Sequence, residues 1–236
     1  MTILDVLKSV ARQVKDEIPQ SITTGDDTTN ELLGYAEHGA ARIFNDYDWR
    51  YLEDEYKIMT ADGAESYDLP SDFDSMVSYG IYDITDGRMI LTETPDERLR
   101  RIAEGDFGET DVCFRLRKDK VWFTGPYTTG HSLWFAYKSK NYVKTHDEAG
   151  NVKYTDVFNA DTDEFVLNNH LLIAATIAAR SINLQLDDAA TRIQEYTELL
   201  EICKNKDAAL YKNTLNNGTP GVLSVSKVMC NPGGTF

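Results

Sequence analysis

The sequence is poor in several residue types, and each shortage argues against a class of protein. Only 24 of its 236 residues are Lys or Arg, against 39 Asp or Glu, so the formal net charge is −15. Such a surface repels DNA phosphates and anionic lipids within about 8 Å, which argues against a sequence-reading DNA-binding protein. The cysteines Cys113, Cys203 and Cys230 are odd in number and far apart, which favours reduced thiols in a cytosolic compartment.

Long apolar runs and targeting signals are also missing. The longest apolar run, LLIAATIAA at residues 171–179, is far shorter than the roughly 20 residues that a membrane helix needs, so it predicts a buried helix. The first residues, MTILDVLKSV, lack the basic segment and apolar core of a signal peptide. We therefore expect no membrane partner.

Motifs typical of enzymes and cofactor sites are absent. The sequence has no phosphate-binding glycine loop, no HExxH and no GxSxG. Its four histidines stand in no recognisable order with a nucleophile and an acid. Glu53, Asp54 and Glu55 could resemble the carboxylate pair of a glycoside hydrolase, but so acidic a chain offers many such pairs. We expect no enzymatic activity, no metal and no cofactor.

Apolar residues at helical spacing predict four helices, two at each end of the folded part. The first follows a cap at Thr2 and stops before Pro19, and the second begins at the capping box Thr28–Glu31. The third starts near Asp161–Glu164 and should be central, because it is apolar on nearly every side. The fourth runs from about Asp187 to Tyr211.

Residues 56–155 have a different pattern, rich in aromatic and β-branched residues. Asp62-Gly63 and Asp86-Gly87 are hairpin turn signals, and strands alternate around Lys118-Asp119. We predict an α+β fold: an antiparallel bundle of about four helices with an inserted β-rich module and an extended C-terminal arm. The predicted parts are residues 1–55, 56–155, 156–211 and 212–236.

The last 25 residues differ in charge from the rest of the chain. Residues 212–236 contain two lysines and no acid, so their charge is +2 and that of the remainder is −15 − 2 = −17. Glycine and proline residues flank the segment VLSVSKVM, in which apolar and polar residues alternate. Such a strand suits pairing with the sheet edge of a partner. The alternative is that it folds back on its own domain. The candidate docking residues are Lys212, Leu215, Val222, Leu223, Val225, Lys227, Val228, Met229 and Phe236.

The stretch from Asp48 to Phe73 predicts a corner. Pro70 fixes its own φ and favours an extended Leu69, so the strand from Tyr67 should end there. Asp68 and Asp72 can accept hydrogen bonds from backbone amides at such a corner. We predict a structural hinge between the helical part and the module, made by Trp49, Tyr67, Leu69, Pro70, Asp72 and Phe73.

This stretch also carries a resemblance to a known family. Asp48-Trp-Arg-Tyr-Leu52, the strand KIMTA, the Asp62-Gly63 turn and Tyr67–Phe73 resemble tail tubular protein A and related portal-bound head-to-tail adaptors of short-tailed bacteriophages. The order of helices, β-rich insertion, helices and arm agrees over nearly the whole chain, whereas the content of residues 75–154 departs from the family pattern.

The resemblance implies a non-enzymatic homo-oligomer. Such adaptors form a dodecameric ring below the portal, extend the DNA channel and present a platform for a distal tail or nozzle protein, with tail fibres as further partners. DNA would pass through during ejection without being bound. The chain would be assembled in the host cytoplasm into the virion tail, with the C-terminal arm on the portal protein.

Two alternatives and one basic cluster remain. The chain could be a cell-wall glycan hydrolase that uses Glu53 and Glu55, or a carbohydrate-binding tail component that uses exposed aromatic residues. The aromatic candidates are Trp122, Tyr127 and Trp134. The cluster is expected to form salt bridges within the module or ring rather than to bind nucleic acid; its members are Arg98, Arg100, Arg101, Arg115 and Arg117.

Overall fold

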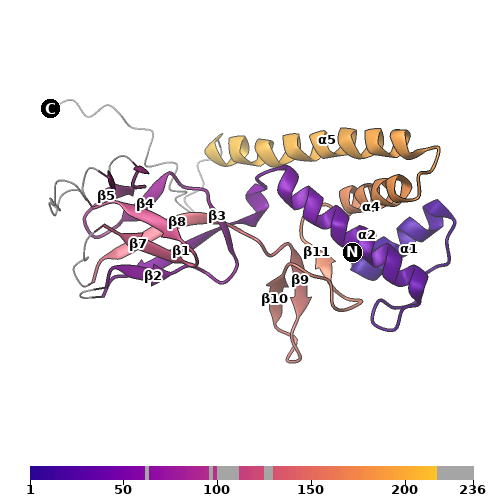
Figure 1. Ribbon diagram of the computed structural model, residues 1–236, viewed down its shortest axis with the longest axis horizontal. Helices are drawn as coiled ribbons and strands as arrows, with labels where there is room; N and C mark the ends of the chain where they lie inside the picture. Colours follow the sequence, from indigo (N-terminus) through magenta and orange to yellow (C-terminus); the bar gives the residue numbers. More distant parts are fainter. Residues whose placement is uncertain (62–63, 96–97, 100–111, 125–129, 217–236) are drawn as a thin grey trace. The chain divides into compact units, whose positions relative to one another are not determined.

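The computed structural model of the chain describes residues 1–61, 64–95, 98–99, 112–124 and 130–216 (Figure 1). These residues divide into two compact units. Unit 1 comprises residues 1–52 and 140–216, and unit 2 comprises residues 53–139. The sequence placed the corresponding boundaries at 55/56 and 155/156. Within the described residues, no helix is both long enough and apolar enough to cross a membrane.

Unit 1 combines helices with a small sheet. Its helical elements are α1 (Ile3–Val14), α2 (Asp27–Asp46), the 3-10 turn η1 (Arg50–Leu52), α4 (Asn169–Asn183) and α5 (Ala189–Asn216). Its antiparallel sheet has the order β10-β9-β11, formed by β9 (Val143–His146), β10 (Val152–Thr155) and β11 (Glu164–Phe165).

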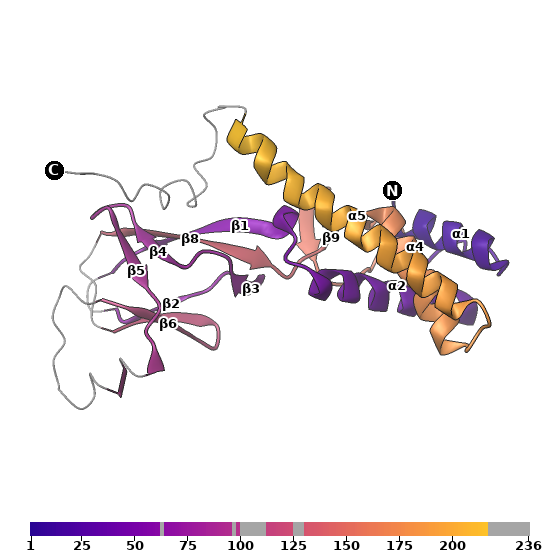
Figure 2. The same ribbon diagram turned by 90° about the horizontal axis from the view of Figure 1, so that it is seen from above.

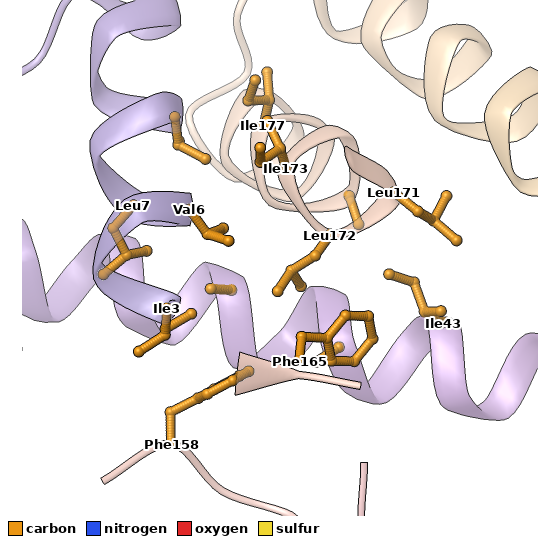
Figure 3. Packing of buried hydrophobic residues seen from close by; sticks show 14 of the residues in the cluster. Ile3, Val6, Leu7, Ile43, Phe158, Phe165, Leu171, Leu172, Ile173 and Ile177 are labelled. Atoms are coloured by element: carbon orange, nitrogen blue, oxygen red, sulfur yellow. The ribbon is translucent and has the colours of Figure 1, made fainter. Parts of the chain in front are cut away.

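Helix α4 is the centre of unit 1, as its apolar sequence predicts, because it packs against α1, α2 and α5. Leu171 and Leu172 are fully buried. Figure 3 shows Leu172 and Phe165 of β11 among side chains of α1 and α2. The core therefore includes the sheet as well as the helices, and Val143 and Phe158 contribute from outside the helices.

The helix starts follow the sequence prediction at α1 and at α5, which begins at Ala189, just after the predicted Asp187. At α1, Thr2 and Asp5 form a capping box. Helix α2 is capped by Asp26, whose Oδ1 accepts from the Thr29 amide at 2.8 Å, so the predicted Thr28–Glu31 box does not form the cap. Helix α4 is capped by Asn168 rather than near residues 161–164.

Two aspartates in the predicted helix start instead fix a loop. Asp161 Oδ1 accepts from the Ile22 amide at 2.6 Å. Asp163 is fully buried, and its Oδ2 accepts from the amides of Asn159 and Ala160 at 2.6 and 2.9 Å. These carboxylates satisfy loop amides that have no sheet partner, which is why the helix starts several residues later.

Unit 2 consists of two antiparallel sheets (Figure 2). The larger has the order β1-β8-β4-β5, with β3 also paired to β8; its strands are β1 (Glu53–Met59), β3 (Phe73–Met76), β4 (Gly80–Asp83), β5 (Arg88–Leu91) and β8 (Ser132–Ser139). The smaller has the order β2-β7-β6, formed by β2 (Ser66–Asp68), β6 (Phe114–Arg117) and β7 (Lys120–Phe123).

The two sheets of unit 2 share one core, distinct from that of unit 1. Phe135 of β8 and Phe114 of β6 are buried in the same cluster. Two predicted turns are confirmed: residues 84–87 connect β4 to β5, with Gly87 at φ +66, and Lys118-Asp119 connects β6 to β7. The predicted Asp62-Gly63 turn lies outside the described residues.

The prediction of a four-helix bundle with one inserted β module is wrong, although the α+β class is retained. The described residues contain four α-helices and 11 strands in three antiparallel sheets. Strands β9 and β10 lie within residues 56–155, which were predicted to be β-rich, but they form a sheet with β11 that belongs to unit 1 with the helices. The physical reason is that Val143 of β9, Phe158 and Phe165 of β11 are buried in the same cluster as the helix residues, so the sheet is part of that core.

The close packing of α2 on α4 depends on Gly39. A Cβ added there would lie 3.1 Å from the Ala175 Cβ, whereas one added at Gly34 would have nothing within 4 Å. We expect Gly39→Leu to lower the free energy of unfolding by about 1–3 kcal/mol through overpacking. Gly34→Leu should raise it by about 0.5–1 kcal/mol through helix propensity. Urea unfolding of both variants tests this, and equal effects would contradict it.

Candidate functional site

Trp49 lies in unit 1, three residues before the chain enters unit 2. Its side chain is 4% exposed, and its Nε1 donates to the Ile43 carbonyl at 2.7 Å. Tyr47 packs edge-on against it at 5.0 Å between ring centroids. Just after it, the Arg50 amide donates to the buried Asp207 of α5 at 3.1 Å. These contacts fix the chain between the end of α2 and η1.

The other predicted hinge residues lie in unit 2. Tyr67 is paired with Val121 in the β2–β7 ladder, and the Leu69 amide donates to the Asp119 carbonyl at 2.8 Å. Leu69 is buried. The Pro70 carbonyl accepts from the Phe73 amide at 3.0 Å, so a turn separates β2 from β3.

Asp72 is held by side chains of β8 rather than by local amides. Its carboxylate accepts from the Tyr137 hydroxyl at 3.1 Å and from the Ser139 hydroxyl at 2.6 Å. Burial, with the nearby charge of Asp72 as the next cause, raises the pKa of Tyr137. Asp68 instead forms an ion pair with Lys120 at 2.8 Å. Both aspartates stabilise strand packing, through contacts that the local sequence does not reveal.

Replacing Asp72 tests this role. Asp72→Ala leaves the Tyr137 hydroxyl, in a side chain only 4% exposed, without its carboxylate acceptor. We expect the free energy of unfolding to fall by about 1–3 kcal/mol. The control is Asp74→Ala, because Asp74 lies two residues further along the chain and is exposed on β3. Chemical unfolding would contradict the prediction if the two variants were equally stable.

Both connections to unit 2 leave from paired strands. Strand β1 follows η1 directly, and β8 is the last strand before the chain returns to unit 1 at residue 140. Glu53 pairs with Lys138, and the ladder continues to Met59 and Ser132. The insertion therefore begins and ends on adjacent strands.

The candidate docking arm is described only at its start. Helix α5 continues to Asn216, so the backbones of Lys212 and Leu215 are helical. The other seven candidates, from Val222 to Phe236, lie outside the described residues.

One cluster that the sequence did not predict lies at the β4–β5 turn. Asp83 is fully buried; its Oδ2 is 2.9 Å from His131 Nδ1, and its Oδ1 accepts from the Thr85 amide at 2.9 Å. Asp86 Oδ2 lies 3.6 Å from the same imidazole and 3.5 Å from Arg88 Nε. Two carboxylates and one imidazole could together bind a cation. The hydrogen bonds and ion pairs among these side chains, however, are sufficient to explain why they lie together. His131 and Asp83 are 48 residues apart, so local spacing gives no signal.

The residues proposed for glycan chemistry do not form a site in the described part of the chain. Glu53, Asp54 and Glu55 are exposed on β1, an edge strand of its sheet. Trp122 and Trp134 are half-buried, and Trp134 Nε1 donates to the Ser132 hydroxyl at 3.0 Å. Tyr127 lies outside the described residues.

The basic cluster is partly described, and it lines a groove. Arg98 and Arg115 lie with Leu99 and Leu116 around a surface groove of about 480 Å³ beside β6. Arg117 is exposed at the end of the same strand. Arg100 and Arg101 lie outside the described residues.

Two buried tyrosines should make the free energy of unfolding fall at alkaline pH. Burial, followed by the hydrogen bond to Asp46 at 2.9 Å, raises the pKa of Tyr196; Tyr137 is shifted in the same direction. In the unfolded chain the pKa of tyrosine is about 10. The contribution of the two neutral tyrosines to the free energy of unfolding is complete below that pH and is lost as the pH rises above it. We expect a loss of about 1 kcal/mol per pH unit for each tyrosine, and Tyr196→Phe should make the decline shallower. Urea unfolding between pH 8 and 11 tests this.

Comparison with known protein families gives a match over residues 1–217 to the SU10 adaptor protein family. The chain belongs to the SU10 adaptor protein family. This confirms the predicted resemblance to phage head-to-tail adaptors, and it supports a structural role in the virion. A comparison with curated proteins finds no match. The SU10 adaptor match includes Lys212 and Leu215 and ends before the other candidate docking residues.

Proposed function

We propose that this SU10 adaptor is the subunit of a dodecameric ring below the portal. The ring would continue the DNA channel and provide the attachment platform for the distal tail or nozzle protein. The family match over residues 1–217 carries the proposal. The net charge of −15 supports passage of DNA without adhesion, because Lys and Arg contacts to phosphates supply non-specific DNA affinity.

We propose residues 212–236 as the portal-docking arm. The charge of this segment is +2, whereas the rest of the chain carries −17. Its alternating apolar residues suit strand addition to a partner. We propose that residues in the segment Trp49–Phe73 form the hinge that joins unit 1 to the β-rich unit 2.

The assembly can be tested with purified portal complex of the same virus. The full chain should form rings on the portal in electron micrographs. A variant that lacks residues 217–236, and so keeps α5 to its end, should not. Unfolding curves of the two proteins provide the folding control. Rings without the arm would overturn arm docking, and failure of the full chain to form rings would overturn the ring.

A further inference from the structure

Arg98 and Arg115 line the groove beside β6, and Arg117 lies at the end of the same strand. Within the described residues, Arg98, Arg115 and Arg117 take part in no ion pair; on the neighbouring strand, Lys120 is neutralised by Asp68 at 2.8 Å. Arg115 Nε is shielded from solvent and has no hydrogen-bond partner. Glu93 also lines the groove but pairs with none of these arginines. Guanidinium groups without a counter-ion at a surface groove favour a carboxylate as the ligand.

The lining favours a protein segment over a nucleic-acid backbone. Leu99 and Leu116 are 65% and 40% exposed, and they lie beside Arg98 and Arg115 on the lining. A polyphosphate chain would leave the leucines in contact with water or charge. A strand with carboxylates and apolar side chains satisfies both features, because arginine binds carboxylates with two parallel hydrogen bonds.

The chain itself carries such a strand. β1 begins with three exposed acids, Glu53, Asp54 and Glu55, and is an edge strand of its sheet in the described structure. Asp54 and Glu55 form no ion pair with any described residue. Met59, which is 55% exposed, lies on the same face as Glu55 by strand alternation.

We infer that the groove beside β6 binds the acidic end of β1 from a second copy of this chain. The groove and the acids are different surfaces of one unit, so the contact is heterologous and repeats from copy to copy in a ring or filament. The inference rests on the ring proposed above and supplies a contact between its neighbouring subunits. It uses the charges of Asp54 and Glu55 and of the arginines, which form no ion pair with a described residue.

Charge reversal tests the contact. Arg115→Glu with Arg117→Glu should weaken self-association in sedimentation experiments by at least about tenfold, and should reduce ring formation on the portal to the same extent. Arg12→Glu with Lys206→Glu makes the same change in net charge on exposed positions of unit 1, and should leave both readouts unchanged. If the first variant does not fold, Arg98→Glu with Arg117→Glu repeats the test on exposed residues.

A charge swap gives the decisive result. Adding Asp54→Arg and Glu55→Arg to the Arg115→Glu, Arg117→Glu chain should restore assembly, because both surfaces are then reversed. Assembly of the Arg115→Glu, Arg117→Glu chain at the wild-type level would overturn the inference and leave the proposed function intact. A wild-type chain that stays monomeric, with and without portal, would overturn both. If the wild-type chain binds duplex DNA and the Arg115→Glu, Arg117→Glu chain does not, the groove binds nucleic acid, and the inference is overturned.

Discussion

Trp49→Ala is expected to lower the free energy of unfolding of unit 1 by about 3–5 kcal/mol. The indole is 4% exposed, so its removal leaves a cavity at the end of α2. It also removes the hydrogen bond to the Ile43 carbonyl and the edge contact with Tyr47. Neighbouring side chains cannot collapse fully into the space, because protein interiors are close-packed.

Tyr51→Ala is the matched control for this substitution. Tyr51 is two residues further along the chain and 69% exposed, so its loss should change stability by less than about 0.5 kcal/mol. Denaturant unfolding followed by circular dichroism measures both variants. A Trp49→Ala midpoint equal to that of Tyr51→Ala would show that the indole does not stabilise the helix end.

Phe135→Ala is expected to have a similarly large effect in unit 2, about 3–5 kcal/mol. Phe135 is fully buried in β8. Its ring contacts Tyr56, Phe73 and Tyr137 at centroid distances of 5.7, 6.4 and 6.2 Å. Its removal therefore disrupts an aromatic cluster that connects three strands. Tyr79→Ala, at a position 85% exposed, is the control and should be nearly neutral.

Calorimetry of these two variants also tests the division of the chain. Trp49 and Phe135 belong to separate clusters of buried residues. We expect two unfolding transitions, with Trp49→Ala lowering the temperature of one and Phe135→Ala that of the other. A single transition lowered equally by both would contradict independent cores.

The sequence was informative where apolar periodicity was strong. It predicted the central position of α4, because burial imposes a helical spacing that can be read directly. The Lys118-Asp119 hairpin was predicted for the corresponding reason in strands. Family resemblance required only residues Asp48–Phe73 and the order of elements.

The failures involve contacts between residues distant in sequence. Asp161 and Asp163 read as a helix start, but their carboxylates bind loop amides, including that of Ile22. β9 and β10 lie within residues 56–155, which the sequence predicted to be β-rich, but they form a sheet with β11 in unit 1 rather than in the module. β11 has only two residues, which is too short for an alternating pattern.

The candidate contacts show the same limit. Asp72 was predicted to accept local amides, whereas its partners Tyr137 and Ser139 are more than 60 residues away. The arginines beside β6 could be recognised as a basic cluster, but not as lining a groove, because the pairing of β6 with β7 positions Arg115 opposite Trp122.

The pairing of Glu53 with Lys138 has a consequence for evolution and engineering. Opposed residues of an antiparallel ladder have Cα atoms only about 5 Å apart, so a short turn can join the two strands in place of everything between them. Unit 2 could thus be excised, or exchanged for another domain with adjacent termini, at little cost in loop entropy. Relatives could in this way exchange unit 2 while unit 1 keeps its own core.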